Sequence, residues 1–302
     1  MDDCGLLFCY AETAVHAGGP DSVGVLDLPV QRESTTRLPT IWGQSTKGAL
    51  RDHAGQDPAR WPDLEAVFGS APPGTTGAGT GPPRPGWLAV GDLRLVAFPV
   101  PTLAHTFAWA TSPLLLARQA RLADVAGVTG VPGVPHVDDG HVVAPSAGRW
   151  WAAEGERVAV GEYDLVADPA SVDLAAWARW FADNGLPRPP RDGVDPFAFF
   201  RQKLAMDLLL VADELLGELT EEHAEVVPRV QLEDDSKTVR HGPWYTEYLP
   251  AETILCAPLR CCSPAGQLAG LGSRLDGEVL VAGGDETVGK GLMWMRWQAG
   301  AA

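Results

Sequence analysis

The stretch GDETVGKG, Gly284–Gly291, comes within one residue of a nucleotide-binding P-loop and decides between two classes of fold. A P-loop requires Ser or Thr directly after its lysine, because that hydroxyl holds the magnesium ion, and here the position is Gly291. A P-loop also opens a helix, whereas the following LMWMRW at 292–297 alternates like a strand. The sequence therefore predicts a glycine-rich turn between two strands, 278–282 and 292–297.

The composition sets wide limits on the class of protein. The chain has 302 residues, enough for one large domain or two modest ones. Its formal net charge of −16 argues against coating nucleic acid by bulk electrostatics; it fits a simple role in solubility and still allows a local basic groove. The five cysteines form no CxxC pair, so neither a disulfide framework nor a zinc site is indicated.

The expected location is the cytoplasm, and no membrane partner is expected. The N-terminus lacks the basic region and apolar core of a signal peptide. No apolar run approaches the ~20 residues that a membrane helix needs.

Strand and helix patterns are intermixed without a regular alternation, which predicts an α+β fold. Ser45 or Thr46 is placed to cap a short helix that follows it. The expected elements are strands at 6–15, 93–99 and 207–211, helices at 47–52, 113–125, 172–183, 197–206 and 214–224, a β-hairpin at about 226–250, and a flexible surface loop at about 70–86 rich in Pro and Gly.

Several motifs are spread over nearly the whole chain: HAGG from His16, GVLDLPVQRE at Gly24–Glu33, PTIWGQSTKGALRD at Pro39–Asp52, and GGDETVGKG at Gly283–Gly291. Together they resemble the RAMP superfamily of CRISPR proteins. More narrowly, the chain resembles the repeated backbone subunit of the type III-B effector, the Cmr complex, since the DLPVQRE run separates that subunit from its type III-A counterpart. The segments 98–110 and 244–250 add support, whereas WGQS at 42–45 departs from the Pro-Gly-Ser-Ser that is usual in the family.

The resemblance implies a fold and an activity. The fold would be a single RAMP domain over 1–302, a modified ferredoxin-like (RRM-like) palm with the hairpin as an inserted thumb. Further copies of the chain would stack in a filament along a guide RNA, together with other Cmr-complex subunits. The complex would cleave target RNA at regular intervals in a reaction that depends on Mg²⁺ or Mn²⁺. Attack by the 2′-hydroxyl would leave 2′,3′-cyclic phosphate and 5′-hydroxyl ends.

Asp27 is the expected catalytic residue and metal ligand. It lies between a glycine and a proline without helix or strand pattern, where an aspartate is ordinarily an Asx-turn former or a cap. Attack by a 2′-hydroxyl needs a base beside it or a metal that lowers its pKa. A carboxylate with a reference pKa of ~4 is a poor base at neutral pH unless a phosphate raises that pKa. The resemblance, in which this aspartate is essential, favours the catalytic assignment.

Three more residues are expected to assist Asp27. His16 would donate a proton to the leaving 5′-oxygen or hold a phosphate, with a purely structural histidine as the equal alternative. Glu247 and Tyr248 lie where the hairpin returns to the palm, a region in which the family has acidic and tyrosine residues of secondary importance. For the tyrosine, ordinary packing in a strand is the alternative.

Guide-RNA contact is expected from a helix face and from the glycine-rich turn. Lys47 and Arg51 are spaced i, i+4 and share one face near a helix start, where free N–H groups favour a phosphate. In the turn, glycines allow close backbone approach and a lysine adds charge. A solvated helix face and a plain tight hairpin are the alternatives. The turn residues expected to contact RNA are Gly283, Gly284, Gly289, Lys290 and Gly291.

Two other functions compete with an RNA-guided endoribonuclease. One is a purely architectural guide-RNA-binding subunit that builds the filament without cutting. The other, an unrelated hydrolase, has little support because GxSxG, HExxH and a His/Cys metal cluster are missing from the sequence. Four basic residues in loops are weaker RNA-binding candidates: Arg32, Arg37, Lys237 and Arg240. Two tryptophans near the C-terminus, Trp294 and Trp297, are expected in the core.

Overall fold

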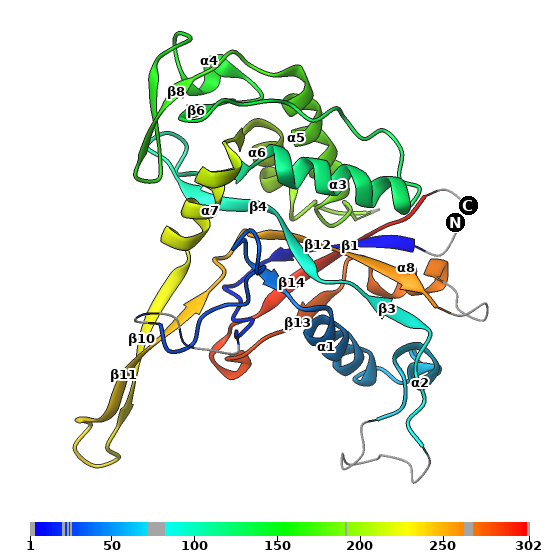
Figure 1. Ribbon diagram of the computed structural model, residues 1–302. Helices are drawn as coiled ribbons and strands as arrows, with labels where there is room; N and C mark the ends of the chain where they lie inside the picture. Colours follow the sequence, from blue (N-terminus) through cyan, green and yellow to red (C-terminus); the bar gives the residue numbers. More distant parts are fainter. Residues whose placement is uncertain are drawn as a thin grey trace.

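The computed structural model describes residues 4–19, 22, 24, 26–71, 82–190, 192–262 and 268–300. Most of its strands form one large sheet that helices cover on both faces (Figure 1), so the predicted α+β class is confirmed. The greater part of the loop predicted at 70–86 lies outside the described residues. None of the helices within these ranges is long and apolar enough to span a membrane.

The large sheet has the strand order β13-β14-β1-β12-β4-β5-β9, with β2 paired to β4 and β3 paired to β12. Its neighbouring strands run antiparallel except for β5 and β9, which are parallel. The strands are β1 (Cys4–Ala11), β2 (Thr40–Ile41), β3 (Leu88–Val90), β4 (Leu93–Pro101), β5 (Phe107–Thr111), β9 (Leu208–Leu210), β12 (Ile254–Cys261), β13 (Val279–Val281) and β14 (Leu292–Gln298). The two strands predicted around the glycine-rich turn are therefore present as β13 and β14.

Strand β1 shows why the sheet has to be covered on both faces. Successive side chains of a strand point to opposite faces. Accordingly Leu7 and Cys9 belong to one core cluster, and Leu6, Phe8 and Tyr10 belong to the other. A strand that is apolar at every position must be buried on both sides. One face is covered by α1 (Gly43–Gly55), α2 (Leu64–Phe68) and α8 (Leu268–Leu275), the other by α3 (Pro113–Val125), α5 (Val172–Asn184) and α6 (Ala198–Met206) (Figure 1).

The predicted helices are present, and Pro113 occupies the first turn of α3 as expected. The helix predicted at 214–224 is α7 (Asp213–Glu222). The prediction that Ser45 or Thr46 caps the short helix is wrong, because α1 already begins at Gly43. Its first N–H groups are bound by side chains from other loops, which no local pattern reveals: Gln31 accepts from Trp42 N and Asp92 accepts from Gly43 N.

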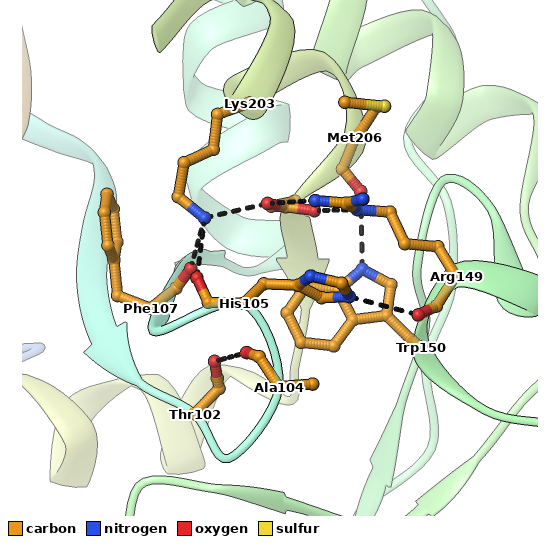
Figure 2. A network of polar contacts seen from close by, with 9 residues as sticks. Thr102, Ala104, His105, Phe107, Arg149, Trp150, Lys203 and Met206 are labelled. Atoms are coloured by element: carbon orange, nitrogen blue, oxygen red, sulfur yellow. Dashed lines mark hydrogen bonds and ion pairs between the residues drawn. The ribbon is translucent and has the colours of Figure 1, made fainter. Parts of the chain in front are cut away.

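Residues 141–167, for which the sequence predicts no element, form a small sheet of the order β6-β8-β7. Its elements are β6 (His141–Val142), α4 (Ala147–Trp150), β7 (Arg157–Val160) and β8 (Tyr163–Ala167). A network of polar contacts attaches it to the rest of the fold (Figure 2). Arg149 binds the fully buried carboxylate of Asp207, which also binds Lys203 at 2.8 Å. The Lys203 ammonium further donates to the carbonyls of His105 and Phe107, so it fixes the turn between β4 and β5.

The predicted hairpin consists of β10 (Glu225–Leu232) and β11 (Val239–Tyr248) and extends away from the sheets and helices (Figure 1). Most of its residues are exposed, and only the last three of β11, Thr246, Glu247 and Tyr248, are buried. The hairpin therefore depends on its base for its connection to the body of the protein.

Candidate functional site

Asp27 lies at the base of the hairpin, in a segment that runs beside β11. Its Oδ2 accepts a hydrogen bond of 2.8 Å from the N–H of Tyr245, and its own N–H donates to the Tyr245 carbonyl at 3.1 Å. The next residue, Leu28, pairs with Thr246 in a parallel bridge. These contacts leave the Asp27 side chain exposed, and no described residue binds its Oδ1. One carboxylate oxygen, Oδ2, is thus held in place by the main chain, and the other, Oδ1, has no partner among the described residues.

Glu247 supports the segment that carries Asp27. Its side chain is 3 % exposed, and its Oε1 lies 2.6 Å from the guanidinium of Arg32. Its Oε2 accepts a hydrogen bond of 2.9 Å from the N–H of Val30. Arg32 also donates to the carbonyls of Thr220 and Arg37. Both carboxylate oxygens of Glu247 are therefore bound inside the protein, and this side chain orients the loop that carries Asp27.

His16 is fixed by the same strand. Its Nδ1 lies 2.8 Å from the carbonyl oxygen of Glu247. A carbonyl oxygen only accepts, so Nδ1 carries the hydrogen, and Nε2 of the neutral ring is an acceptor. The His16 carbonyl in turn accepts from the N–H of Gly284 at 2.8 Å. Tyr245 and Glu247, which hold Asp27 and His16, are two residues apart, about 7 Å along a strand. The structure therefore brings Asp27 and His16 to one end of β11.

Tyr248 is anchored by two residues that sequence reasoning missed. Its hydroxyl donates to Asp285 Oδ2 at 2.7 Å, and Arg229 donates to Asp285 Oδ1 at 2.6 Å. Burial raises the pKa of Tyr248, and the adjacent Asp285 raises it further. Burial alone would also raise the pKa of Asp285, but its hydrogen bonds from Tyr248 and Arg229 outweigh burial and lower that pKa. Asp285 stands in the glycine-rich run; only the folded chain shows which residues it binds.

The glycine-rich loop between β13 and β14 is longer than a tight hairpin and contains a 3₁₀ turn at Glu286–Val288. A Cβ at Gly283, where φ is +94°, would collide with the carbonyl oxygen of His16. At Gly289, where φ is +80°, a Cβ would meet open space. The Lys290 ammonium lies 4.8 Å from the centre of the Tyr248 ring and 3.6 Å from the Glu225 carboxylate. The predicted glycine turn thus packs against His16 and the base of the hairpin.

Lys47 and Arg51 are held elsewhere. Lys47 donates to the carbonyl of Leu88 at 2.8 Å, and Arg51 donates to the carbonyl of Gly69. Burial is the main cause that lowers the pKa of Lys47. Neither side chain has a polar contact with the Asp27 segment or the glycine-rich loop in the part of the chain that the structure describes. In this conformation both cations are bound by main-chain carbonyls.

The remaining candidates have varied surroundings. The Arg32 side chain is 7 % exposed and pairs with Glu247, whereas Arg37 and Arg240 form exposed ion pairs with Glu221 and Glu233. Trp297 is 7 % exposed, which confirms its predicted place in the core, and Trp294 packs partly buried against the second cluster. A cavity of about 490 Å³ opens beside the Asp27 segment, and Leu26, Pro29, Arg32, Arg37, Trp42 and Glu247 are among the residues that line it.

This arrangement can be compared with known proteins. The family model of the RAMP superfamily matches residues 8–293. The chain belongs to the RAMP superfamily. At the sequence level, this RAMP protein is 28 % identical over 299 residues to the CRISPR system Cmr endoribonuclease Cmr4 of Pyrococcus furiosus, a match that covers 95 % of this chain and 93 % of that protein.

Solved structures share the fold of this RAMP protein. Oligomeric Cmr4 from Pyrococcus furiosus superposes with a TM-score of 0.73 at 23 % identity, over 100 % of both chains. A chain of the type III-B Cmr-beta complex bound to cognate target RNA superposes with a TM-score of 0.68 at 19 % identity, over 97 % of this chain and 96 % of that chain.

Proposed function

We propose that this RAMP protein is the repeated backbone subunit of a type III-B CRISPR effector that binds guide RNA and cleaves complementary target RNA at regular intervals. The full-length similarity to the Cmr endoribonuclease supports this function. The observation that carries it is Asp27, an exposed carboxylate held by the main chain of β11 through one oxygen, while no described residue binds the other. The hairpin would be the thumb, and the large sheet with its helices the ferredoxin-like palm.

A divalent ion fits this site with a single protein ligand. No group of three or more His, Cys, Asp and Glu side chains able to hold a metal occurs within the described ranges. Asp27 Oδ1 offers one hard oxygen donor, and Mg²⁺ commonly binds through one or two carboxylates together with substrate phosphates and water. When bound, Mg²⁺ or Mn²⁺ would screen the phosphate and lower the pKa of the 2′-hydroxyl.

The chain's own residues would then orient the reaction. Asp27 orients the 2′-hydroxyl of the target RNA, whose oxygen attacks the adjacent phosphorus and gives up its proton to water. The bond from phosphorus to the 5′-oxygen breaks, and that oxygen takes up a proton, which gives 2′,3′-cyclic phosphate and 5′-hydroxyl ends. His16, with its Nδ1 hydrogen on the Glu247 carbonyl, supplies this proton from Nε2 in its imidazolium form, or holds the phosphate.

Glu247 and Tyr248 have a supporting role in this proposal. Their exposures are 3 % and 1 %, and the polar atoms of both side chains bind protein groups. We therefore assign them to positioning the Asp27 segment and His16, and only Asp27 and His16 to contact with RNA at the reacting atoms.

Guide RNA would lie against the glycine-rich loop, where Gly289 faces open space beside Lys290. Lys47 and Arg51 would have to exchange their carbonyl partners for phosphates in order to join this contact. Further copies of the chain and other Cmr-complex subunits are the expected protein partners. A net charge of −16 requires those contacts to rest on apolar or complementary charged faces.

The test is cleavage of target RNA by the reconstituted complex with Mg²⁺, comparing wild type with Asp27→Asn. Regularly spaced products should disappear while target binding persists, and a 2′-deoxy substitution at the scissile nucleotide should also abolish cutting. Asp139→Asn, an exposed aspartate in another loop, is the matched control and should cut like wild type. If Asp27→Asn cuts normally, the nuclease lies in another subunit. If even the wild type binds target without cutting, the alternative of a purely architectural subunit holds.

A further inference from the structure

We propose that Asp285 is a positioning residue that fastens the base of the β10–β11 hairpin to the glycine-rich loop and thereby sets the orientation of Tyr248 and His16. The inference rests on the proposed function and deepens it, because it adds a residue that contacts neither the reacting atoms nor Asp27.

The Asp285 carboxylate accepts hydrogen bonds from both strands of the hairpin. Arg229, near the middle of β10, donates to Asp285 Oδ1 at 2.6 Å. Tyr248, the last residue of β11, donates to Asp285 Oδ2 at 2.7 Å. The Asp285 side chain is 18 % exposed and the Arg229 side chain 28 % exposed, so this contact is partly shielded from water. A hydrogen bond to a charged group contributes more than one between neutral groups. Two such bonds on different strands restrict both translation and rotation of the hairpin base.

The backbone of the loop presents this carboxylate in a fixed direction. Asp285 has φ 66° and ψ 25°, the left-handed conformation that Asp and Asn adopt more readily than most residues. Its carbonyl accepts from the N–H groups of Val288 and Lys290, which closes the loop. On its other side, Gly284 is bridged to His16. Asp285 therefore projects from a short turn that is bonded at both ends.

The three residues Asp285, Arg229 and Tyr248, here called the clamp, contact His16 through the Tyr248 ring. The ring centres of His16 and Tyr248 are 5.5 Å apart and their planes are tilted by 60°. The Lys290 ammonium lies near the Tyr248 ring and pairs with Glu225, the first residue of β10. The charged groups around the tyrosine are thus Asp285, Arg229, Lys290 and Glu225, two of each sign. The ring is packed among these groups. Loss of the hydrogen bond from the Tyr248 hydroxyl to Asp285 would therefore let the ring move, and His16 packs against this ring.

Asp285→Asn is the variant that tests the clamp. Asparagine has the same shape and tolerates the left-handed conformation, but it loses the charge that binds Arg229 and Tyr248. The matched control is Glu286→Gln, an exposed neighbour that loses the same charge. Hydrogen exchange on the assembled complex without target should rise at 225–229 and 244–248 in Asp285→Asn, and remain unchanged in β1 and β12. Target cleavage should fall roughly ten-fold while guide-RNA binding persists.

A double variant separates positioning from a general structural role. If Asp285 acts through Tyr248, adding Asp285→Asn to Tyr248→Phe should reduce cleavage little beyond the single change. Unchanged exchange at the hairpin base overturns the proposal, as does a rise spread evenly over β1 and β12. Fully additive losses of cleavage overturn it too. A wild-type complex that does not cut contradicts the proposed function instead, and the exchange measurement still decides the clamp.

Discussion

Glu247 and Arg32 form a buried ion pair of 2.6 Å that joins the base of the hairpin to the segment carrying Asp27. The two side chains are 3 % and 7 % exposed. Removing two charges from water is costly, so a buried pair is stable only while both members are present. The pair also places Val30, whose N–H binds the same carboxylate, and thereby fixes the chain just after Asp27.

Arg32→Met should therefore destabilise the protein strongly. It leaves the Glu247 carboxylate buried without its counter-charge, and the free energy of unfolding should drop by about 3–5 kcal/mol. Urea denaturation measures this change. Arg157→Met breaks the exposed pair with Asp164, whose side chains are 58 % and 63 % exposed, and should cost about 0–1 kcal/mol. Similar small losses in both variants would mean that the Glu247–Arg32 pair does not organise this loop.

Removal of divalent ions should stop cleavage without affecting the fold. Structural metal sites tie metal binding to folding, but the described residues contain no group of three or more side chains able to hold a metal. With EDTA, the melting temperature of the subunit and its affinity for guide RNA should stay the same while target cleavage is lost. Re-addition of Mg²⁺ should restore the activity. A large drop in melting temperature with EDTA would contradict the single-ligand site at Asp27.

The elements that local patterns specify could be predicted from the sequence. Helix α3 has proline in its first turn, and α5 has a serine cap, Ser171, whose side chain accepts from Leu174. Strand β12 was not predicted, because burial on both faces removes the alternation that identifies a strand and Pro258 interrupts its pattern. The cap of α1 was placed wrongly since Gln31 and Asp92 supply it from distant loops.

For the candidate site, motif resemblance selected His16 and Asp27, and the structure brings both to β11. The resemblance does not distinguish an exposed carboxylate from a buried one: it implies a catalytic role for Asp27 and an assisting one for Glu247, whose carboxylate is buried in the structure. From the sequence, Asp285 is predicted only to be part of a glycine-rich turn. Its partners Arg229 and Tyr248 become its neighbours only when the hairpin folds back onto the loop.

Glu252 should make stability depend on pH. Its Oε2 is buried with no partner among the described residues, and burial raises its pKa from 4.5 to about 7. Between these two pKa values the Glu252 carboxyl is ionised in the unfolded chain and protonated in the folded protein. Stability should therefore fall as pH rises from about 4.5 to about 7 and then level off, by on the order of 2 kcal/mol. Urea denaturation across this range measures the slope, and Glu252→Gln should reduce it. An identical slope in the variant would assign the effect to other groups.

Two glycines of the glycine-rich loop, Gly283 and Gly289, allow the cost of a steric clash to be separated from the cost of backbone strain. Gly283→Ala and Gly289→Ala both place a side chain at positive φ, +94° and +80°, which costs about 1 kcal/mol. Only at Gly283 does the new Cβ also collide with a main-chain atom, the carbonyl oxygen of His16. Gly283→Ala should therefore lower the free energy of unfolding by at least about 1 kcal/mol more than Gly289→Ala.

Gly283→Ala should also slow target cleavage, because it displaces His16 from Glu247. Thermal unfolding and cleavage by the assembled complex measure the two effects. Equal stability and equal cleavage in both variants would show that the loop yields around Gly283, and that its contact with His16 does not position the histidine.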